Sequence, residues 1–373
     1  MPRRTGSDAD DRSRGPILRS ICRKRSAIEP KWGNLAVRRR GSLAIGTALA
    51  LLIVPLVVAP ASAKPSAQSA RDQVIAYWTP ARMAAAQPRD FVKENGKFVP
   101  RARPGGGGGI VTGKSFSGDG QVRDRVGKVY FHMGGGDWQC SGSVVTDQGR
   151  AGFSMVLTAG HCAIDETTGQ FATNWIFMPS WDRQPATFAT ACQGSLYGCW
   201  TTAGGGGLYV DNDFATAGSF NDQAVTHDWA FAVVGPGGKS GGQLDGNAAI
   251  GAGYALGINS VSANPPDRLA AFGFPAAGKY HGNDLTYCAG PVGQDAGTGN
   301  ATWALACDMT GGSSGGGWLE GVNETSGDGG VLSSLNSYGY SGVKNMYGPK
   351  FNSETDATYN AARTDSSVGN TKV

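Results

Sequence analysis

Residues 307–318 read Cys-Asp-Met-Thr-Gly-Gly-Ser-Ser-Gly-Gly-Gly-Trp, the most informative stretch of the sequence. Glycines beside a serine let a substrate carbonyl approach the backbone closely and leave two backbone N–H groups to face a developing oxyanion. A run of glycine and serine is also typical of a flexible linker. Here, however, Cys307 and the apolar residues 301–306 directly precede the run. The stretch therefore indicates a rigid loop that carries a candidate nucleophile, Ser314.

Two further stretches carry a histidine and an aspartate suited to serve such a serine. Residues 155–162 read Met-Val-Leu-Thr-Ala-Gly-His-Cys, a strand that enters a turn of small residues with His161 beside a cysteine. A crosslink at that cysteine would hold the backbone of a general base in place. Asp228 stands before the apolar residues 229–234, where its carboxylate could accept the second ring proton of a histidine. An aspartate before a strand is also a common turn former, and Asp222 is the reserve candidate.

Short β-type runs separated by Gly, Asn and Asp fill the chain beyond residue 120, with no sustained helical period. Such runs, at this spacing, predict an all-β architecture, either a barrel or a sandwich. The glycine-rich residues 235–242 are expected to connect two halves, and one short helix is expected around 355–363. The expected strands lie at 129–131, 143–145, 155–157, 175–178, 229–234, 269–274, 301–306 and 331–335.

Six of the seven cysteines lie beyond residue 110. An even number of cysteines in an exported protein favours disulfides over metal ligation, and the signal peptide described below indicates export. Six cysteines nevertheless allow many connectivities. Sequence proximity suggests three pairs: Cys140 with Cys162, Cys192 with Cys199, and Cys288 with Cys307. There is no CxxC pair, and the four histidines show no HExxH spacing, so we expect neither a metal nor another cofactor.

Taken in chain order, three motifs resemble those of the trypsin/chymotrypsin-like serine peptidases. They are Thr-Ala-Gly-His161-Cys, Asp228-Trp-Ala and Gly312-Ser-Ser314-Gly-Gly. In addition, residues 140–143 are similar to the cysteine strand that precedes the histidine in that family, and Ser337-Tyr338-Gly339 resembles its substrate-pairing segment. The resemblance spans about residues 120–345 and is greatest to secreted bacterial members.

The resemblance implies two six-stranded antiparallel β-barrels with the active site in the cleft between them. It implies that Ser314 attacks the peptide carbonyl, that His161 takes and returns the proton, and that Asp228 orients His161. The backbone N–H groups of Gly312 and Ser314 would form the oxyanion hole. Ser314 is preferred to Ser313 as the nucleophile because two glycines must follow it.

The sequence departs from the family around the nucleophile. Many animal-type members carry an aspartate at the position of Ser313, where it pairs with a new N-terminal amine. Without that aspartate, we interpret the similarity of residues 110–113 (Ile-Val-Thr-Gly) to a mature N-terminus as coincidental. Asp308 lies where trypsins place the acid that binds Arg or Lys, so we favour a preference for basic side chains. Glutamyl endopeptidases carry similar residues there but use a histidine after the nucleophile, and none follows His281.

The N-terminal region holds the positive charge of the 373-residue chain, whose formal net charge is +4. Residues 1–63 carry 12 Lys and Arg against 4 Asp and Glu, whereas residues 111–373 carry 13 against 22. Residues 43–58 are apolar, follow three arginines and lead to small residues at 61 and 63, which is typical of a signal peptide. An uncleaved membrane anchor is the alternative. The acidic remainder gives no support to nucleic-acid binding.

Residues 64–110 shift to charge, Pro and Ala and end in five glycines, a flexible connector. We interpret them as a pro-segment that is removed; a solvated N-terminal extension is the alternative. Two other patterns are set aside. The run Gly235 to Ser240 lacks the first glycine of a phosphate-binding loop, and Asp211-Asn212-Asp213 fits a polar turn better than a calcium site.

These observations predict four parts: a signal peptide with a long leader (1–63), a pro-segment with a glycine-rich linker (64–110), an N-terminal barrel (111–238) and a C-terminal barrel with a helix or tail (239–373). The expected protein is a secreted, monomeric serine endopeptidase, made as a zymogen, that acts on proteins or peptides without stable membrane association. A catalytically inactive binding protein with the same fold is the rival. Hydrolysis of esters or cell-wall peptides would use the same mechanism.

Overall fold

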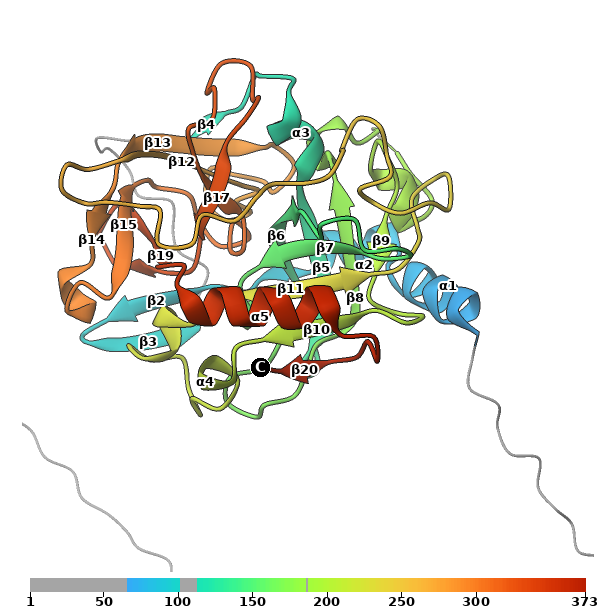
Figure 1. Cartoon of the computed structure of the whole chain (residues 1–373), viewed down its shortest axis with the longest axis horizontal. Helices are drawn as coiled ribbons and strands as arrows, with labels where there is room; N and C mark the ends of the chain where they lie inside the picture. The colour runs from blue at the N-terminus through green and yellow to red at the C-terminus, as the bar shows by residue number, and fades with distance from the viewer. Residues whose placement is uncertain (1–65, 101–112, 186) are drawn as a thin grey trace, which may run out of the picture. The chain divides into compact units, whose positions relative to one another are not determined.

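Antiparallel strands dominate the computed structural model, which describes residues 66–100, 113–185 and 187–373 (Figure 1). All of them belong to one compact unit, residues 62–373. The expected signal peptide, the glycine run and the Ile110 motif lie outside the described residues.

The first half of the described chain, with one short strand from the C-terminus, forms one curled sheet. Its strands pair in the order β20-β10-β11-β7-β6-β5-β8-β9, with β1 on the side of β6. Six strands are four or more residues long: β5 (Val126–Met133), β6 (Gly136–Val145), β7 (Ser154–Thr158), β8 (Thr173–Pro179), β10 (Gly207–Val210) and β11 (Ala230–Val234). Three are two residues long: β1 (Gln87–Pro88), β9 (Trp200–Thr201) and β20 (Thr371–Lys372).

The second half again has six longer strands. They are β12 (Arg268–Gly273), β13 (Thr286–Pro291), β15 (Thr302–Ala306), β16 (Gly317–Glu320), β17 (Val331–Leu335) and β19 (Asn345–Pro349). They pair as β17-β16-β12-β13-β4 and as β14-β15-β19, where β4 (Lys114–Ser115) and β14 (Gly293–Gln294) are short. The fold is therefore the expected pair of β-barrels, each built on six main strands.

Every apolar run that predicted a strand coincides with one, namely β5, β6, β7, β8, β11, β12, β15 and β17. Strands β7 and β11 are buried at every position, which explains why their sequences are continuous apolar runs rather than alternating ones. The expected C-terminal helix is α5 (Ser353–Thr364), whose start is fixed by a capping box between Asn352 and Thr355. Residues 235–242 contain no strand, as expected of a connector.

Helix α5 and strand β20 return the chain to the first barrel. Helix α5 packs on β10 and β11, and β20 adds to the edge of β10 in parallel (Figure 1). Trp229 Nε1 donates to Thr358 Oγ1 at 3.2 Å, and Tyr209 OH donates to Asp365 Oδ2 at 2.9 Å. The end of the second barrel is thereby attached to the first. Two short helices occur beside strands of the first barrel: α3 (Gln121–Arg125) directly precedes β5, and α4 (Asn212–Ala215) follows β10.

Residues 66–100, expected only to be a pro-segment, are folded onto the barrels. They form α1 (Ala67–Tyr77), α2 (Pro80–Ala85), β1, β2 (Phe91–Glu94) and β3 (Lys97–Pro100). Trp78, between the helices, is fully buried, and its Nε1 donates to Asn174 O at 2.6 Å. Strands β2 and β3 form a hairpin whose other edge pairs with β18 (Gly339–Tyr340). Within the described ranges, no helix combines the length and the apolar character needed to cross a membrane.

Candidate active site

Strand pairing brings His161 and Asp228 together, although 67 positions separate them in the sequence. Strands β7 and β11 are antiparallel neighbours in which Thr158 faces Ala230. His161 follows that pair on one strand and Asp228 precedes it on the other, so both side chains emerge at the same end of the sheet. Both are fully buried.

The carboxylate of Asp228 accepts three hydrogen bonds. Its Oδ1 accepts from the backbone N–H of His161 at 2.8 Å, and its Oδ2 lies 2.8 Å from His161 Nδ1. Ser337, which comes from the second barrel, donates its hydroxyl to the same Oδ2 at 2.5 Å. Because an ionised carboxylate only accepts, Nδ1 is the donor in this pair; in a neutral imidazole that donates from Nδ1, Nε2 keeps its lone pair. The reserve candidate, Asp222, lies elsewhere: its half-exposed side chain pairs with Lys93.

A disulfide fixes the backbone of this histidine. Cys162 is bonded to Cys140 on β6, and Trp175 Nε1 donates to the carbonyl of Cys162 at 3.2 Å. The structure also pairs Cys192 with Cys199 and Cys288 with Cys307. In the part of the chain that the structure describes, one group of three potential metal ligands occurs, Cys140, His161 and Cys162. Its two sulfurs are bonded to each other, so they offer no thiolate.

Ser314 lies in the loop between β15 and β16, on the second barrel. Its carbonyl accepts the N–H of Ser141 at 2.7 Å, and the neighbouring Gly315 donates to Asn336 O at 2.8 Å. Gly315 has a φ of 81°, and a Cβ there would collide with Thr158 Oγ1 and with the carbonyl of Ser141. The glycine that follows the serine is therefore required by the close approach of the two barrels. Ser313 turns away: its hydroxyl donates to Thr310 O at 2.8 Å.

Two backbone N–H groups beside Ser314 are oriented by their surroundings. The carbonyl of Gly311 accepts the N–H of Ala276 at 2.7 Å. Since a trans peptide points its N–H opposite to its C=O, the N–H of Gly312 points away from Ala276. Neither this N–H nor that of Ser314 makes a backbone hydrogen bond within the described ranges. Both donors are therefore left unused by the backbone around the loop.

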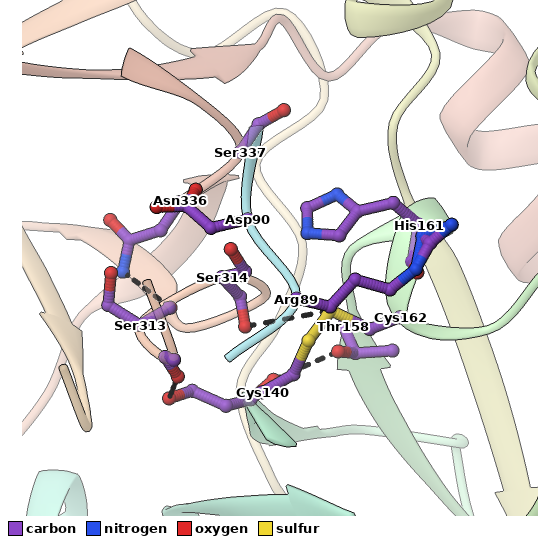
Figure 2. The surroundings of a disulfide bond; sticks show 12 residues. Arg89, Asp90, Cys140, Thr158, His161, Cys162, Ser313, Ser314, Asn336 and Ser337 are labelled. Carbon is purple, nitrogen blue, oxygen red and sulfur yellow. Dashed lines mark hydrogen bonds between the residues drawn. A yellow bond between two sulfur atoms is a disulfide. The ribbon is translucent and has the colours of Figure 1, made fainter. Parts of the chain in front are cut away.

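The histidine and the serine are not bonded to each other in this state. Among the described residues, His161 Nε2 has no hydrogen-bond partner. Ser314 is only 2% exposed and His161 is 0% exposed, so a substrate cannot reach them. Figure 2 shows Arg89 and Asp90 together with both residues in the surroundings of the Cys140–Cys162 disulfide.

Residues 89–91 cover the site and were not foreseen from the sequence. Arg89 donates to the carbonyl of His161 at 2.9 Å and to Glu166 Oε2 at 2.8 Å. Phe91 stacks on Phe220 with ring centroids 3.9 Å apart and meets the ring of His161 edge-on. No local sequence pattern marks these contacts, because each partner is distant in the chain.

The segment expected to pair with a substrate, residues 337–339, makes contacts within the chain. Tyr338 is fully buried, stacks on Tyr347, and donates its hydroxyl to Asp295 Oδ2 at 2.5 Å. Its neighbour Gly339 begins β18, and β18 pairs along one edge with β2. The hydroxyl of Ser337 donates its hydrogen bond to Asp228. The three residues therefore lie beside the candidate triad, and strand β2 of the same chain runs along them.

Asp308, expected to bind basic side chains, is already partnered. Its Oδ2 accepts from Lys279 Nζ at 2.7 Å, and its Oδ1 accepts from Tyr280 OH at 2.5 Å and from the N–H of Gly113 at 2.8 Å. Burial acts to raise the pKa of Asp308, but the hydrogen bonds from these three groups outweigh it and lower the pKa below its ordinary value. The carboxylate is 3% exposed. This arrangement gives the predicted basic preference no support.

Comparison with known proteins identifies enzymes of similar structure. No protein-family model and no curated protein sequence matches the chain. Among solved structures, the chain is similar to the thermostable serine protease AL20 from an extremophilic microorganism, with 32% identity, a TM-score of 0.53 and coverage of 66% of this chain and 100% of that one. It is also similar to the protease Anisep from Arthrobacter nicotinovorans, with 32% identity, a TM-score of 0.52 and coverage of 65% and 96%. Because the identity extends along almost the whole of both proteases, the similarity goes beyond the fold, and the chain belongs to the trypsin/chymotrypsin-like family of serine proteases.

Proposed function

We propose that Ser314, His161 and Asp228 form the catalytic triad of a secreted serine endopeptidase that is made as a precursor. The hydrogen bond between His161 Nδ1 and Asp228 Oδ2 carries the proposal. It fixes the tautomer in which Nε2 can accept a proton, next to a serine on a loop that glycine alone can form. The three disulfides fit an exported protein.

The reaction follows from the roles of these groups. Ser314 Oγ attacks the peptide carbonyl while His161 Nε2 takes the hydroxyl proton, and Asp228 stabilises the imidazolium that forms. The N–H groups of Gly312 and Ser314 bind the oxyanion of the tetrahedral intermediate. His161 then gives its proton to the leaving amine, which departs and leaves an acyl-enzyme. Water, deprotonated by His161, releases the acid and restores Ser314.

The substrate must run through the cleft in one direction. Residues on the acyl side of the scissile bond add to the edge of β18, beside Ser337 and Gly339. Because His161 gives its proton to the leaving amine, we place the leaving-group side toward the disulfide next to His161, along β6 at Gln139. A productive substrate, followed from its N-terminus, therefore passes β18 first, then Ser314, then β6.

Covalent labelling tests the proposal. The precursor is built with the recognition sequence of an unrelated protease in place of residues 105–109, cut there, and freed of its N-terminal piece. A fluorophosphonate probe should then label Ser314 stoichiometrically, and the freed enzyme should hydrolyse fluorescein-labelled casein. Failure to label this freed form would favour the inactive binding protein instead.

The variant Asp308→Asn tests whether Asp308 determines which substrate side chain the enzyme prefers at the cleavage site. Because the carboxylate is engaged by Lys279, Tyr280 and Gly113, we expect the cleavage pattern of the freed enzyme on a peptide library to be unchanged. Stability should fall by about 1–3 kcal/mol at pH 7, since charged hydrogen bonds are lost. A lowered folded-state pKa stabilises the fold above the unfolded pKa and loses that effect in acid, so the difference should shrink as the pH falls below about 4.

Two readouts check the Asp308 prediction: library profiling, and denaturant unfolding in a Ser314→Ala background at several pH values. Loss of cleavage after Arg and Lys in Asp308→Asn, with other cleavages retained, would restore the basic preference that the sequence predicted.

A further inference from the structure

We propose that residues 86–100 act as a reversed-strand inhibitor: they fill the substrate cleft with the opposite chain direction to a substrate, so that the enzyme is blocked without cutting them. The inference rests on the proposed function for the direction of productive binding. It goes beyond that function because it assigns to this segment a specific, cleavage-resistant binding mode.

Two strand pairings establish the direction. Strand β1 pairs in parallel with β6, with Gln87 facing Trp138 and Pro88 facing Gln139. Strand β2 pairs in parallel with β18, with Val92 facing Gly339 and Lys93 facing Tyr340. Followed from its N-terminus, the segment therefore meets β6 first, crosses the site at residues 89–91, and reaches β18 last. A productive substrate meets the same strands in the opposite order.

Reversal separates binding from chemistry. Edge pairing and side-chain pockets tolerate a strand of either direction, because a β edge offers both N–H and C=O groups. Hydrolysis needs more: a carbonyl carbon against Ser314 Oγ, its oxygen toward Gly312 N–H, and its nitrogen toward His161. A reversed backbone exchanges the positions of the carbonyl and the nitrogen. It can therefore occupy the cleft tightly while presenting no scissile bond in the reactive orientation.

A buried ion pair anchors the segment at the centre of the cleft. The side chains of Arg89 and Glu166 are only 10% and 6% exposed, and the guanidinium also holds the carbonyl of His161. Removing one partner of such a pair leaves an uncompensated buried charge. The backbone adds further bonds on the β6 side: Arg89 N–H donates to Gln139 O at 3.3 Å, and Gln139 Nε2 donates to Ala86 O at 2.7 Å.

Aromatic contacts anchor the segment on the other side of the histidine. Phe91 is buried between Phe220 and His161, and Phe98 on β3 meets Phe220 and Tyr338 edge-on. The hairpin turns at Asn95 and Gly96, both with positive φ (49° and 75°), as a two-residue turn requires. The turn returns Phe98 to the same aromatic cluster that holds Phe91, so the hairpin closes over the cleft as one unit.

Cysteine crosslinking determines the chain direction of residues 86–100 in the cleft without relying on catalysis. In the precursor, the pair Gln87→Cys and Trp138→Cys should form a disulfide rapidly under mild oxidation. The matched pair Gln87→Cys and Tyr340→Cys should not, since only a segment of substrate-like direction would bring residue 87 toward β18. Crosslinking of the second pair in preference to the first would overturn the reversed direction.

Inhibition is measured on the precursor cut at residues 105–109, with fluorescein-labelled casein as the probe. At micromolar concentration, activity should remain about 100-fold below that of the freed enzyme, rise on dilution, and leave residues 66–100 intact by mass spectrometry. In the Arg89→Ala variant, the cut segment should dissociate from the enzyme at protein concentrations at least about tenfold higher than in the unsubstituted chain. Lys97→Ala, which removes an exposed cation from the same hairpin, is the matched control and should behave as the unsubstituted chain does.

The outcomes are distinct. An active freed enzyme that cuts its own segment between residues 89 and 92 faster than the segment dissociates would overturn the inhibitor. Full activity of the cut precursor before dilution would overturn it as well. Failure of the proposed function gives a different result, namely a freed enzyme that neither labels nor hydrolyses casein while the Gln87–Trp138 crosslink still forms.

Discussion

Replacing Ser314 by alanine should reduce the turnover of casein by the freed enzyme by about 10⁶-fold, to the level that the oxyanion hole and binding alone supply. In the proposed mechanism, Ser314 Oγ is the atom that forms the acyl-enzyme, and the adjacent serine does not offer a second hydroxyl in its place. Ser313 donates to Thr310 O, on the other side of the loop. The variant should fold normally, because the contacts of the loop run through its backbone.

Ser313→Ala is the matched control for this result. It removes one neutral hydrogen bond, worth about 1 kcal/mol of stability, and should change turnover by less than about tenfold. Steady-state kinetics of the two variants, with thermal unfolding to verify their folding, separate the adjacent serines. A larger loss of activity in Ser313→Ala than in Ser314→Ala would refute the assignment of the nucleophile.

Asp228→Asn should lower turnover by about 10⁴-fold with little change in KM. An asparagine of the same shape can keep the hydrogen bond from the N–H of His161. Its amide would then face Nδ1 with a donor, which favours the tautomer that carries the proton on Nε2. In that tautomer, His161 can no longer accept the proton of Ser314. The loss should therefore appear in kcat.

The reserve aspartate supplies the control for the Asp228 prediction. Asp222 is 55% exposed at its side chain and contacts Lys93 of the covering segment, so Asp222→Asn should leave the freed enzyme within a few-fold of the unsubstituted one. Kinetics of both variants on the same casein substrate decide between the two candidates. Equal losses, or a greater loss in Asp222→Asn, would show that the triad has been assigned to the wrong aspartate.

Much of the fold and the candidate triad could be predicted because their sequence signals are local. An apolar run followed by Ala-Gly-His, an aspartate before an apolar strand, and a serine among glycines each meet a chemical requirement within a few residues. The pairing of β7 with β11 then adds the third dimension, and it follows from the burial of both strands.

The covering segment shows where such prediction ends. The sequence predicts only a pro-segment here, whereas in the structure Ser66 and Thr79 cap two helices. The helices and strands of residues 66–100 are too short to be stable alone, so their positions depend on surfaces distant in the chain. The surroundings of Asp308 were unpredictable for the same reason. Its distance from Ser314 in the sequence does not reveal that Lys279, on another loop, pairs with it.

The return of α5 and β20 to the first barrel bears on the geometry of the triad. His161 and Asp228 belong to that barrel, whereas Ser314 belongs to the second, so the relative placement of the barrels sets the distance between the proposed base and the proposed nucleophile. The last twenty-one residues attach the end of the second barrel to the first. Thr358 accepts a hydrogen bond from Trp229, the immediate neighbour of Asp228, and β20 pairs with β10. The C-terminal residues thereby help to keep the two halves of the proposed active site in position.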